Sequence, residues 1–394
     1  MRIRCEQKQP EALQTSKVVT IAAGHAAHDT YSAFLPPLLP VFIEKLSLVK
    51  AEAGLLTVFL QAPSLLQPFI GHLGDRLDLR FAVILTPAIT AACMSLLGVA
   101  PGYAMIALLL VTAGVSAALL HSVAPVLAGR LSGRRLGYGM GFWMVGGEVG
   151  RTLGPIVVVS AIAVFGLEGT PWLMVGGFAA STLLFFGLQG VSSAPTHDTQ
   201  SESFFRVTFS MRSLLLPLVG IVTARAFMMA ASTTYLPIFL REEGAGLWFA
   251  GASLSVLEAG GVVGALLGGF ASDVLGRKRV LVFSFLAATP IMLAMVHASG
   301  WFRLPLLLTL GCVGLMATPV LMASVQESFP SNRALANGIY MALSFSVRSI
   351  VVVLVGVLAD RVGMRQAFLT CAVLALMGTP FIFLLPGKSE ASGQ

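Results

Sequence analysis

Apolar stretches of membrane-spanning length recur along this chain from Val18 to Leu385. Each holds roughly 20 residues, which is enough for an α-helix to cross about 30 Å of hydrocarbon. Their apolar residues do not alternate with polar ones, as the strands of a membrane barrel would require. With 56% hydrophobic and 11% charged residues, the chain lacks the charged surface of a soluble globule. The sequence therefore predicts an all-α protein that crosses the membrane many times.

We expect twelve transmembrane helices, six in each half of the chain. The predicted spans are 18–43, 52–72, 80–99, 103–129, 137–166, 170–190, 213–240, 247–271, 280–298, 302–327, 334–360 and 366–385. The predicted domains are a terminal segment 1–17, a six-helix bundle 18–190, a polar linker 191–212, a second six-helix bundle 213–385 and a tail 386–394.

Two loops of similar sequence lie half a chain length apart. One, GHLGDRLDLR, begins at Gly71, and the other, GGFASDVLGRKR, begins at Gly268. Asp75 and Asp273 hold equivalent places in them. Because each half has an even number of spans, the two copies share one orientation, so both loops face the same side of the membrane.

Lysine and arginine residues are distributed unevenly between the two sides. Sixteen fall on the side of the two similar loops and six on the other. The positive-inside rule then places both termini and both loops in the cytoplasm. The net charge of +7 reflects this orientation, so we expect no nucleic-acid partner.

The cysteines show no paired or metal-type spacing, and we expect free thiols. The polar N-terminal segment contains no cleavable signal pattern, so the first span should direct the chain to the membrane.

The two loops resemble a signature of major facilitator superfamily transporters, which lies between helices 2 and 3 and, in a weaker copy, between helices 8 and 9. The resemblance implies two six-helix bundles and a transporter rather than an enzyme. It also implies that the loops close the cytoplasmic side by contacting helix N-termini or arginines of a neighbouring helix. The implied gating residues are Gly71, Asp75, Arg76, Arg80, Gly269, Asp273, Arg277 and Lys278. In the second loop Val274 occupies one of the arginine positions.

Two further stretches carry a more specific resemblance. Gly150-x-x-x-Gly154-Pro155 resembles the helix-5 signature of proton-coupled antiporters, although a later glycine is replaced by valine. Small residues there would also permit close helix packing, and both readings stay open. The run GHAAHDTYSAFLPPLLPVFIEKL, the run AEAGLLTVFLQAPSLLQPFIGHLGDR and His121 resemble the fosmidomycin-resistance branch, which is similar to proton-driven exporters of antibiotics. The chain departs from that branch after His121 and in the charges of its fifth span.

Six ionisable residues lie far from the ends of the predicted spans. They are Asp29, Glu148, Glu258, Arg151, Arg225 and Arg348. A charge at the bilayer centre costs roughly 2.5–3.5 kcal/mol, so these groups must pair or face water. Glu148 and Arg151 are three residues apart and can pair within one helix, which would make them mainly structural. Binding of the coupling proton by Glu148 is the alternative, and both stay open. For Asp29, Arg225 and Arg348 we favour a water-filled cavity between the bundles, and for Glu258 the cavity and a structural ion pair both stay open.

The first and seventh spans are related by their prolines. Pro36, Pro37 and Pro40 predict that the outer half of the first span bends or unwinds. Leu236-Pro237 occupies the equivalent place in the seventh span. This alignment puts Arg225 about one turn from the level of Asp29.

Histidines cluster around Asp29. His25, His28 and Asp29 share one helical face, and His121 lies in the fourth span. Histidine changes charge near neutral pH, so the cluster fits proton or substrate binding, although hydrogen-bonded core histidines are the alternative. His25, His28 and Asp29 also have a spacing that suits a metal, but without a clear fourth ligand we expect no bound metal.

The sequence thus predicts a monomeric secondary transporter in the plasma membrane that exports a small anionic or polar, antibiotic-like organic compound by proton antiport. We expect alternating access and no cofactor, with the proton as coupling ion. Arg225, Arg348 and Arg151 would suit an anionic group on the substrate. A proton-coupled importer of organic anions and, as a lesser alternative, a metal-ion or metal-complex transporter share this architecture. A membrane enzyme or receptor is disfavoured because the chain shows no paired Ser/His/Asp or HExxH pattern and no extra soluble domain.

Overall fold

The computed structural model describes residues 14–67, 69–70, 78–132, 136–191, 212–328 and 333–385. Within these ranges the backbone is helical with short turns and contains no strand. In chain order the helices are α1 (Thr15–Ser32), α2 (Leu35–Leu46), α3 (Lys50–Gln61), η1 (Ala62–Leu66), α5 (Arg80–Leu96), η2 (Leu97–Val99), α6 (Tyr103–Leu131), α7 (Leu136–Phe165), η4 (Leu167–Leu173), α8 (Met174–Gly187), α10 (Arg212–Met229), η5 (Ala230–Tyr235), α11 (Leu236–Glu242), α12 (Leu247–Leu275), α13 (Arg277–His297), η6 (Gly300–Phe302), α14 (Arg303–Leu315), α15 (Ala317–Ser328), α16 (Arg333–Val362), α17 (Met364–Leu376) and α18 (Thr379–Phe383). The all-α prediction is confirmed for this part of the chain.

Ten helical segments within the described ranges are long and apolar enough to cross a membrane. They correspond to the third through twelfth predicted spans. The first predicted span falls on α1 with α2, and the second on α3 with η1. These two spans are interrupted, and α1 also carries the polar His25, His28 and Asp29. The predicted linker and tail lie almost wholly outside the described residues, so the domain boundaries stay predictions.

Prolines explain the interruption of the first span. α2 begins at Leu35, and Pro36 and Pro37 occupy its first turn, where a backbone N–H needs no helical acceptor. In the second half of the chain, α10 passes through the π-helical turn η5 into α11, which begins at Leu236 and Pro237. The predicted bend of the first span is confirmed, and the aligned place in the second half is also deformed.

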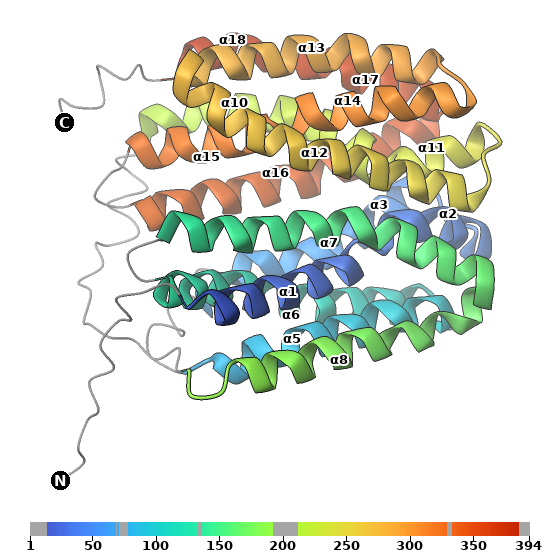
Figure 1. Ribbon diagram of the computed structural model, residues 1–394. Helices are drawn as coiled ribbons and strands as arrows, with labels where there is room; N and C mark the ends of the chain where they lie inside the picture. The colour runs from blue at the N-terminus through green and yellow to red at the C-terminus, as the bar shows by residue number, and fades with distance from the viewer. Residues whose placement is uncertain are drawn as a thin grey trace.

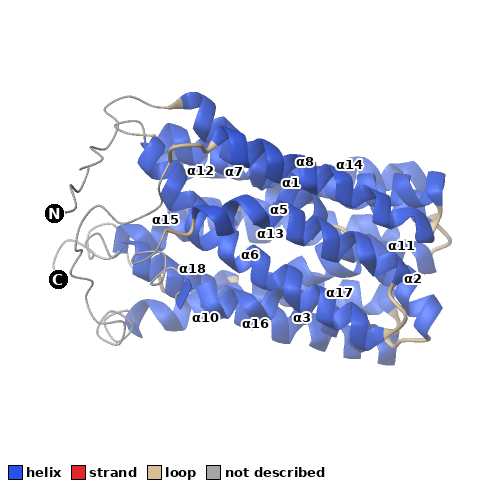
Figure 2. Ribbon diagram, turned by 90° about the horizontal axis from the view of Figure 1, so that it is seen from below, coloured by secondary structure: helices blue, strands red, loops and turns tan. Residues whose placement is uncertain are grey.

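The two halves of the chain form two groups of helices that lie against each other. In Figure 1, α1 to α8 (blue to green) fill the lower part of the molecule and α12 to α18 (yellow to red) the upper part. The view from below in Figure 2 shows the helices running side by side from one end of the molecule to the other. We call these groups the N-terminal and C-terminal bundles. They meet through α7 against α12 and through α3 against α16.

Polar contacts between the bundles are concentrated towards one end of the molecule. We call the end at which α1 begins the near face, and the end at which α2 leads into α3 the far face. At the far face, Asp360 of α16 accepts hydrogen bonds from the backbone N–H groups of Lys50 and Ala51 at 2.9 and 3.0 Å. Lys50 also forms an ion pair with Glu242 at 3.0 Å. Further cross-bundle hydrogen bonds and ion pairs lie between the level of Arg151 and this face.

The buried apolar side chains follow the same division. One large core combines both bundles in the far half of the molecule, where Phe42 of α2 and Phe239 of α11 belong to the same cluster. Towards the near face the core divides. One cluster there is built from the N-terminal bundle, including Val18, and another from the C-terminal bundle, including Leu214. The bundles are therefore packed together at the far face and have separate cores at the near face.

Candidate functional site

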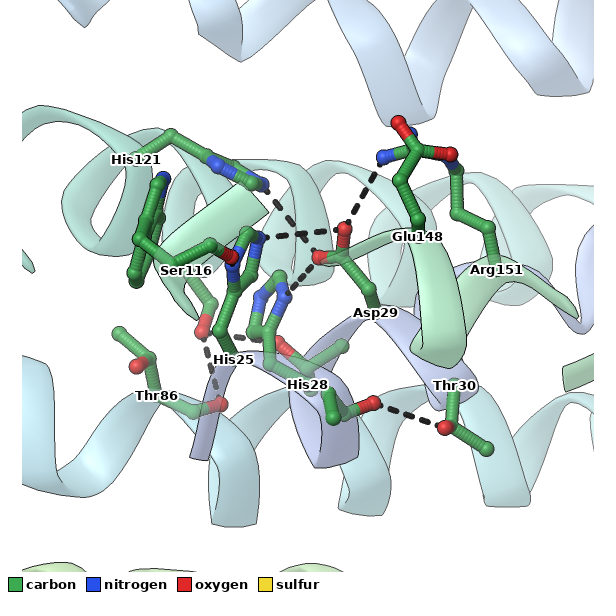
Figure 3. Close-up of polar contacts among 12 residues, drawn as sticks. His25, His28, Asp29, Thr30, Thr86, Ser116, His121, Glu148 and Arg151 are labelled. Atoms are coloured by element: carbon green, nitrogen blue, oxygen red, sulfur yellow. Dashed lines mark hydrogen bonds and ion pairs between the residues drawn. The ribbon is translucent and has the colours of Figure 1, made fainter. Parts of the chain in front are cut away.

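The carboxylate of Asp29 lies at the centre of a buried histidine cluster (Figure 3). His28 Nδ1 is 2.9 Å from Asp29 Oδ1, and His25 Nε2 is 3.3 Å from Asp29 Oδ2. His121 of α6 reaches the same carboxylate, with Nε2 3.4 Å from Oδ1. The expectation that His25, His28 and Asp29 share one side of α1 is confirmed, and the structure adds His121 to them.

The contacts of His25 specify where protons must lie. Its Nδ1 is 2.9 Å from the carbonyl oxygen of Trp143, which can only accept a hydrogen bond, so Nδ1 must carry a proton. Its Nε2 faces the carboxylate of Asp29, which accepts as well when ionised. A neutral His25 would thus direct a lone pair at a negative oxygen. His25 thus presents Nε2 to the carboxylate of Asp29, where an additional proton would be shared by the two groups.

Trp143 of α7 fixes the orientation of this histidine. The indole and imidazole rings are stacked with centroids 3.6 Å apart and planes 12° apart. His25 and Trp143 are both buried, whereas the side chain of His121 is 34% exposed. His121 is therefore the member of the cluster that water reaches most readily.

Arg151 of α7 connects the cluster to the other charged residues. Its Nη1 lies 3.4 Å from Asp29 Oδ2, and its Nη2 donates to Glu148 Oε1 (Figure 3). Its Nε lies 4.0 Å from Glu258 Oε2 on α12, in the other bundle. The predicted pairing of Glu148 with Arg151 within one helix is confirmed. Because Arg151 faces two further carboxylates, the pair is also part of a contact between the bundles.

Glycines of α7 allow this close approach. A Cβ atom at Gly150 would lie 2.4 Å from the carbonyl oxygen of Ala26, and one at Gly154 would lie 2.3 Å from that of Thr30. α1 and α7 are therefore in backbone contact, and the packing role expected for these glycines is confirmed. Pro155 follows within the helix and has no N–H to donate to the carbonyl of Arg151. The antiporter role of this motif stays a prediction.

Arg225 and Arg348 are separate from the Asp29 cluster. Arg225 of α10 donates to the hydroxyl of Thr318, and Arg348 of α16 donates to the hydroxyl of Thr233 at 3.1 Å. Among the residues that the structure describes, neither guanidinium has a carboxylate within 4.0 Å. The sequence alignment placed Arg225 near the depth of Asp29, but the two do not form an ion pair. Sequence reasoning also missed Thr233 and Thr318, because a threonine in an apolar span has no distinctive signal.

The second similar loop forms ion pairs within its own bundle. Arg277 Nη2, at the start of α13, lies 2.7 Å from Asp273 and 2.8 Å from Glu327 of α15. Lys278 donates to the carbonyl of Phe383 at 3.1 Å. Asp273 thus pairs with an arginine of its own loop, four residues along the chain, and the expected closing contact of the loop stays a prediction. Asp273 remains 67% exposed, and its partner Arg277 belongs to the same bundle.

The first similar loop is described only at its end. Arg80 donates to the carbonyl of Val191 at 2.9 Å, within the N-terminal bundle. Gly71, Asp75 and Arg76 lie outside the described residues. Gly269, in the second loop, has open space where a side chain would project.

One group of side chains has the spacing of metal ligands. The ligand atoms of His25, Asp29 and His121 lie within 4.8 Å of one another. This corrects the set expected from sequence, because His121 takes the place of His28. The reason is that His121 comes from another helix, and only the tertiary fold brings it to Asp29. Arg151 contacts the same carboxylate, and its positive charge opposes binding of a cation there.

Comparison with known proteins relates the whole chain to one transporter family. The family model described as Major Facilitator Superfamily matches residues 21–352 and 254–394. The fosmidomycin resistance protein of Escherichia coli (strain K12) is 24% identical, covering 96% of this chain and 97% of that protein. The uncharacterized MFS-type transporter YfnC of Bacillus subtilis (strain 168) is 23% identical, covering 95% and 93%.

Solved structures share the fold at lower sequence identity. A bacterial homologue of the human lysosomal transporter Spinster, in an inward-facing and unoccupied conformation, superposes with a TM-score of 0.78 at 15% identity, covering 96% of this chain and 97% of that one. A mutant of the nucleoside transporter NupG gives 0.77 at 14% identity, covering 94% and 100%.

Proposed function

The chain belongs to the Major Facilitator Superfamily, and we propose that it exports a small anionic or polar organic compound in exchange for protons. It is a multi-pass membrane transporter and not an enzyme. The observation that carries the proposal is the contact of His25 with Asp29, where an additional proton would be shared by the two groups. A titratable site at this depth, with the partly exposed His121 beside it, suits an exchangeable coupling proton.

Arg151 can transmit a change in protonation to the contact between the bundles. It is shared by Asp29, Glu148 and Glu258, and Glu258 lies in the other bundle. When Asp29 is neutralised by a proton, Arg151 is attracted less to α1 and more to the remaining carboxylates. Protonation therefore strengthens the cross-bundle attraction at this level, and loss of the proton weakens it. This links proton binding to alternating access, in which the two bundles rock about a site near the midplane.

The direction of transport rests on the relatives. The E. coli relative is a fosmidomycin resistance protein, and removal of an antibiotic from the cell is one way to confer resistance. We place the protein in the plasma membrane as a monomer, with the near face and both termini in the cytoplasm. In that orientation the cytoplasmic ends of the bundles have separate cores and the outer ends are packed together. The arrangement fits a substrate that enters from inside.

Flux in proteoliposomes tests the proposal. Fosmidomycin is the first compound to supply, and a pH-sensitive dye reports protons moving against it. We expect fosmidomycin movement to drive opposite proton movement in the wild type and not in Asp29→Asn. His297→Gln, which changes an exposed histidine at the end of α13, is the matched control and should exchange normally. Transport that persists unchanged after the pH gradient is collapsed would exclude proton antiport as the mechanism.

A second candidate function, proton-coupled import of an organic anion, is favoured by one observation. The carboxylates of the site surround Arg151, whereas Arg225 and Arg348 have no carboxylate partner among the described residues. An anion bound to the arginines and a proton bound to the carboxylates would reduce both charges together, which suits symport. The same dye experiment separates the two functions, because symport moves protons with the compound and antiport moves them against it.

A further inference from the structure

The buried charges are divided unequally between the two bundles. In the described part of the chain, Asp29, Glu148 and Glu258 all lie around the single guanidinium of Arg151. Arg225 and Arg348, both in the C-terminal bundle, each contact a hydroxyl instead. Around Arg151 the carboxylates outnumber the guanidinium, whereas Arg225 and Arg348 contribute positive charge without a carboxylate partner among the described residues.

Arg225 and Arg348 have donors to spare. A guanidinium carries five N–H donors, and each of these two uses a threonine hydroxyl as its hydrogen-bond partner. The Nε atom of each is buried and has no partner. Both residues are nevertheless partly exposed. Buried cationic donors without a counter-charge are costly, and an anion would offset that cost.

The two arginines lie on helices that pack against each other, Arg225 on α10 and Arg348 on α16. A guanidinium without a carboxylate partner is stabilised when an oxyanion binds to it, because its planar N–H fork matches the oxygens of phosphate and carboxylate groups.

We propose that Arg225 and Arg348, oriented by Thr318 and Thr233, form an oxyanion-binding site in the C-terminal bundle that receives the anionic group of the transported compound. The proposal rests on the proposed function, because it assigns the substrate end of that transport cycle. Arg151 is not part of this site, since its guanidinium is already surrounded by three carboxylates. Proton binding and anion binding then occur in different bundles.

Titration calorimetry on the purified full-length protein in lipid nanodiscs tests the site. The probes are inorganic phosphate and phenylphosphonate, added without any pH gradient. We expect Arg225→Gln and Arg348→Gln each to weaken binding by on the order of tenfold to a hundredfold, since each removes charge-assisted hydrogen bonds. Arg303→Gln is the control, because Arg303 is a buried arginine already paired with Glu243 at 3.1 Å.

Smaller changes keep the test valid if an arginine variant does not fold. Thr233→Val and Thr318→Val preserve side-chain size, remove only the orienting hydroxyls and should weaken binding severalfold. Unchanged affinity in the arginine and threonine variants would overturn the site, as would failure of the wild type to bind either probe. The result is independent of proton coupling, because a protein without antiport could still bind the probes through these arginines. Conversely, if the wild type carries out antiport but binds neither probe, the oxyanion site is excluded and the proposed antiport is not.

Discussion

Asp360→Asn should weaken the contact that holds the two bundles together at the far face. The carboxylate of Asp360, on α16, accepts hydrogen bonds from the first two backbone N–H groups of α3, those of Lys50 and Ala51. These groups have no acceptor within their own helix, and the N-terminus of a helix carries partial positive charge. A carboxylate of one bundle thus caps a helix of the other. The asparagine side chain has similar size but offers one acceptor oxygen and no charge.

The expected magnitude follows from these two bonds. Loss of an N-terminal cap costs about 0.5–2 kcal/mol, and a negative charge at an exposed helix N-terminus contributes about 0.3–1 kcal/mol. Because the contact is exposed to solvent, we expect a combined loss of about 1 kcal/mol. This corresponds to about a fivefold shift of the equilibrium towards states in which the far face is open.

Spin labels at Ser47 and Gln366 measure this shift through the distance between them. Both positions are exposed at the far face, and they lie on opposite bundles. Double electron–electron resonance in a background without the native cysteines should show a larger fraction of long distances in Asp360→Asn. Glu44→Gln is the control, because Glu44 is 81% exposed and its ion pair with Arg241 is 4.0 Å long. An unchanged distance distribution, or the same change in both variants, would show that Asp360 does not hold the far face closed.

Three further predictions concern packing and pH. Gly150→Ala should destabilise the protein by about 1–3 kcal/mol, measured by thermal denaturation, because the new Cβ would lie 2.4 Å from a backbone carbonyl oxygen of α1; an unchanged melting temperature would contradict it. Tyr235→Phe should cost about 1–2 kcal/mol in the same assay, because the buried Tyr235 Oη lies 2.8 Å from the carbonyl oxygen of Val352; a stabilised variant would argue against this contact. The hydrogen bond from Arg365 lowers the pKa of Glu243, so Glu243 should add stability above the ordinary carboxyl pKa and lose it as pH falls through its lowered value. Glu243→Gln should accordingly reduce the difference in melting temperature between neutral and acidic pH, and an identical difference in both proteins would count against the assignment.

Local sequence patterns were sufficient for features that depend on neighbouring residues. The prolines after Leu35 predicted the break between α1 and α2, because proline acts on its own turn of the backbone. The spacing of Glu148 and Arg151 predicted their ion pair, since residues three apart are neighbours on a helix. The free cysteines of the described residues were predicted in the same way, from spacing.

Contacts between distant helices could not be predicted in this way. Trp143 stacks on His25 from α7, and Asp360 caps α3 from the other bundle, more than 300 residues along the chain. Neither residue belongs to a motif, and their partners are set by how the helices are packed. The metal-type group was assigned to His28 instead of His121 for the same reason.

Antiport requires that substrate binding release the coupling proton that we propose for His25 and Asp29. Purified protein in a weakly buffered solution with a pH indicator can be mixed with fosmidomycin, or with the transported compound once it is identified. We expect proton release from the wild type and none from Asp29→Asn. Substrate binding that releases the same number of protons from both proteins would contradict it.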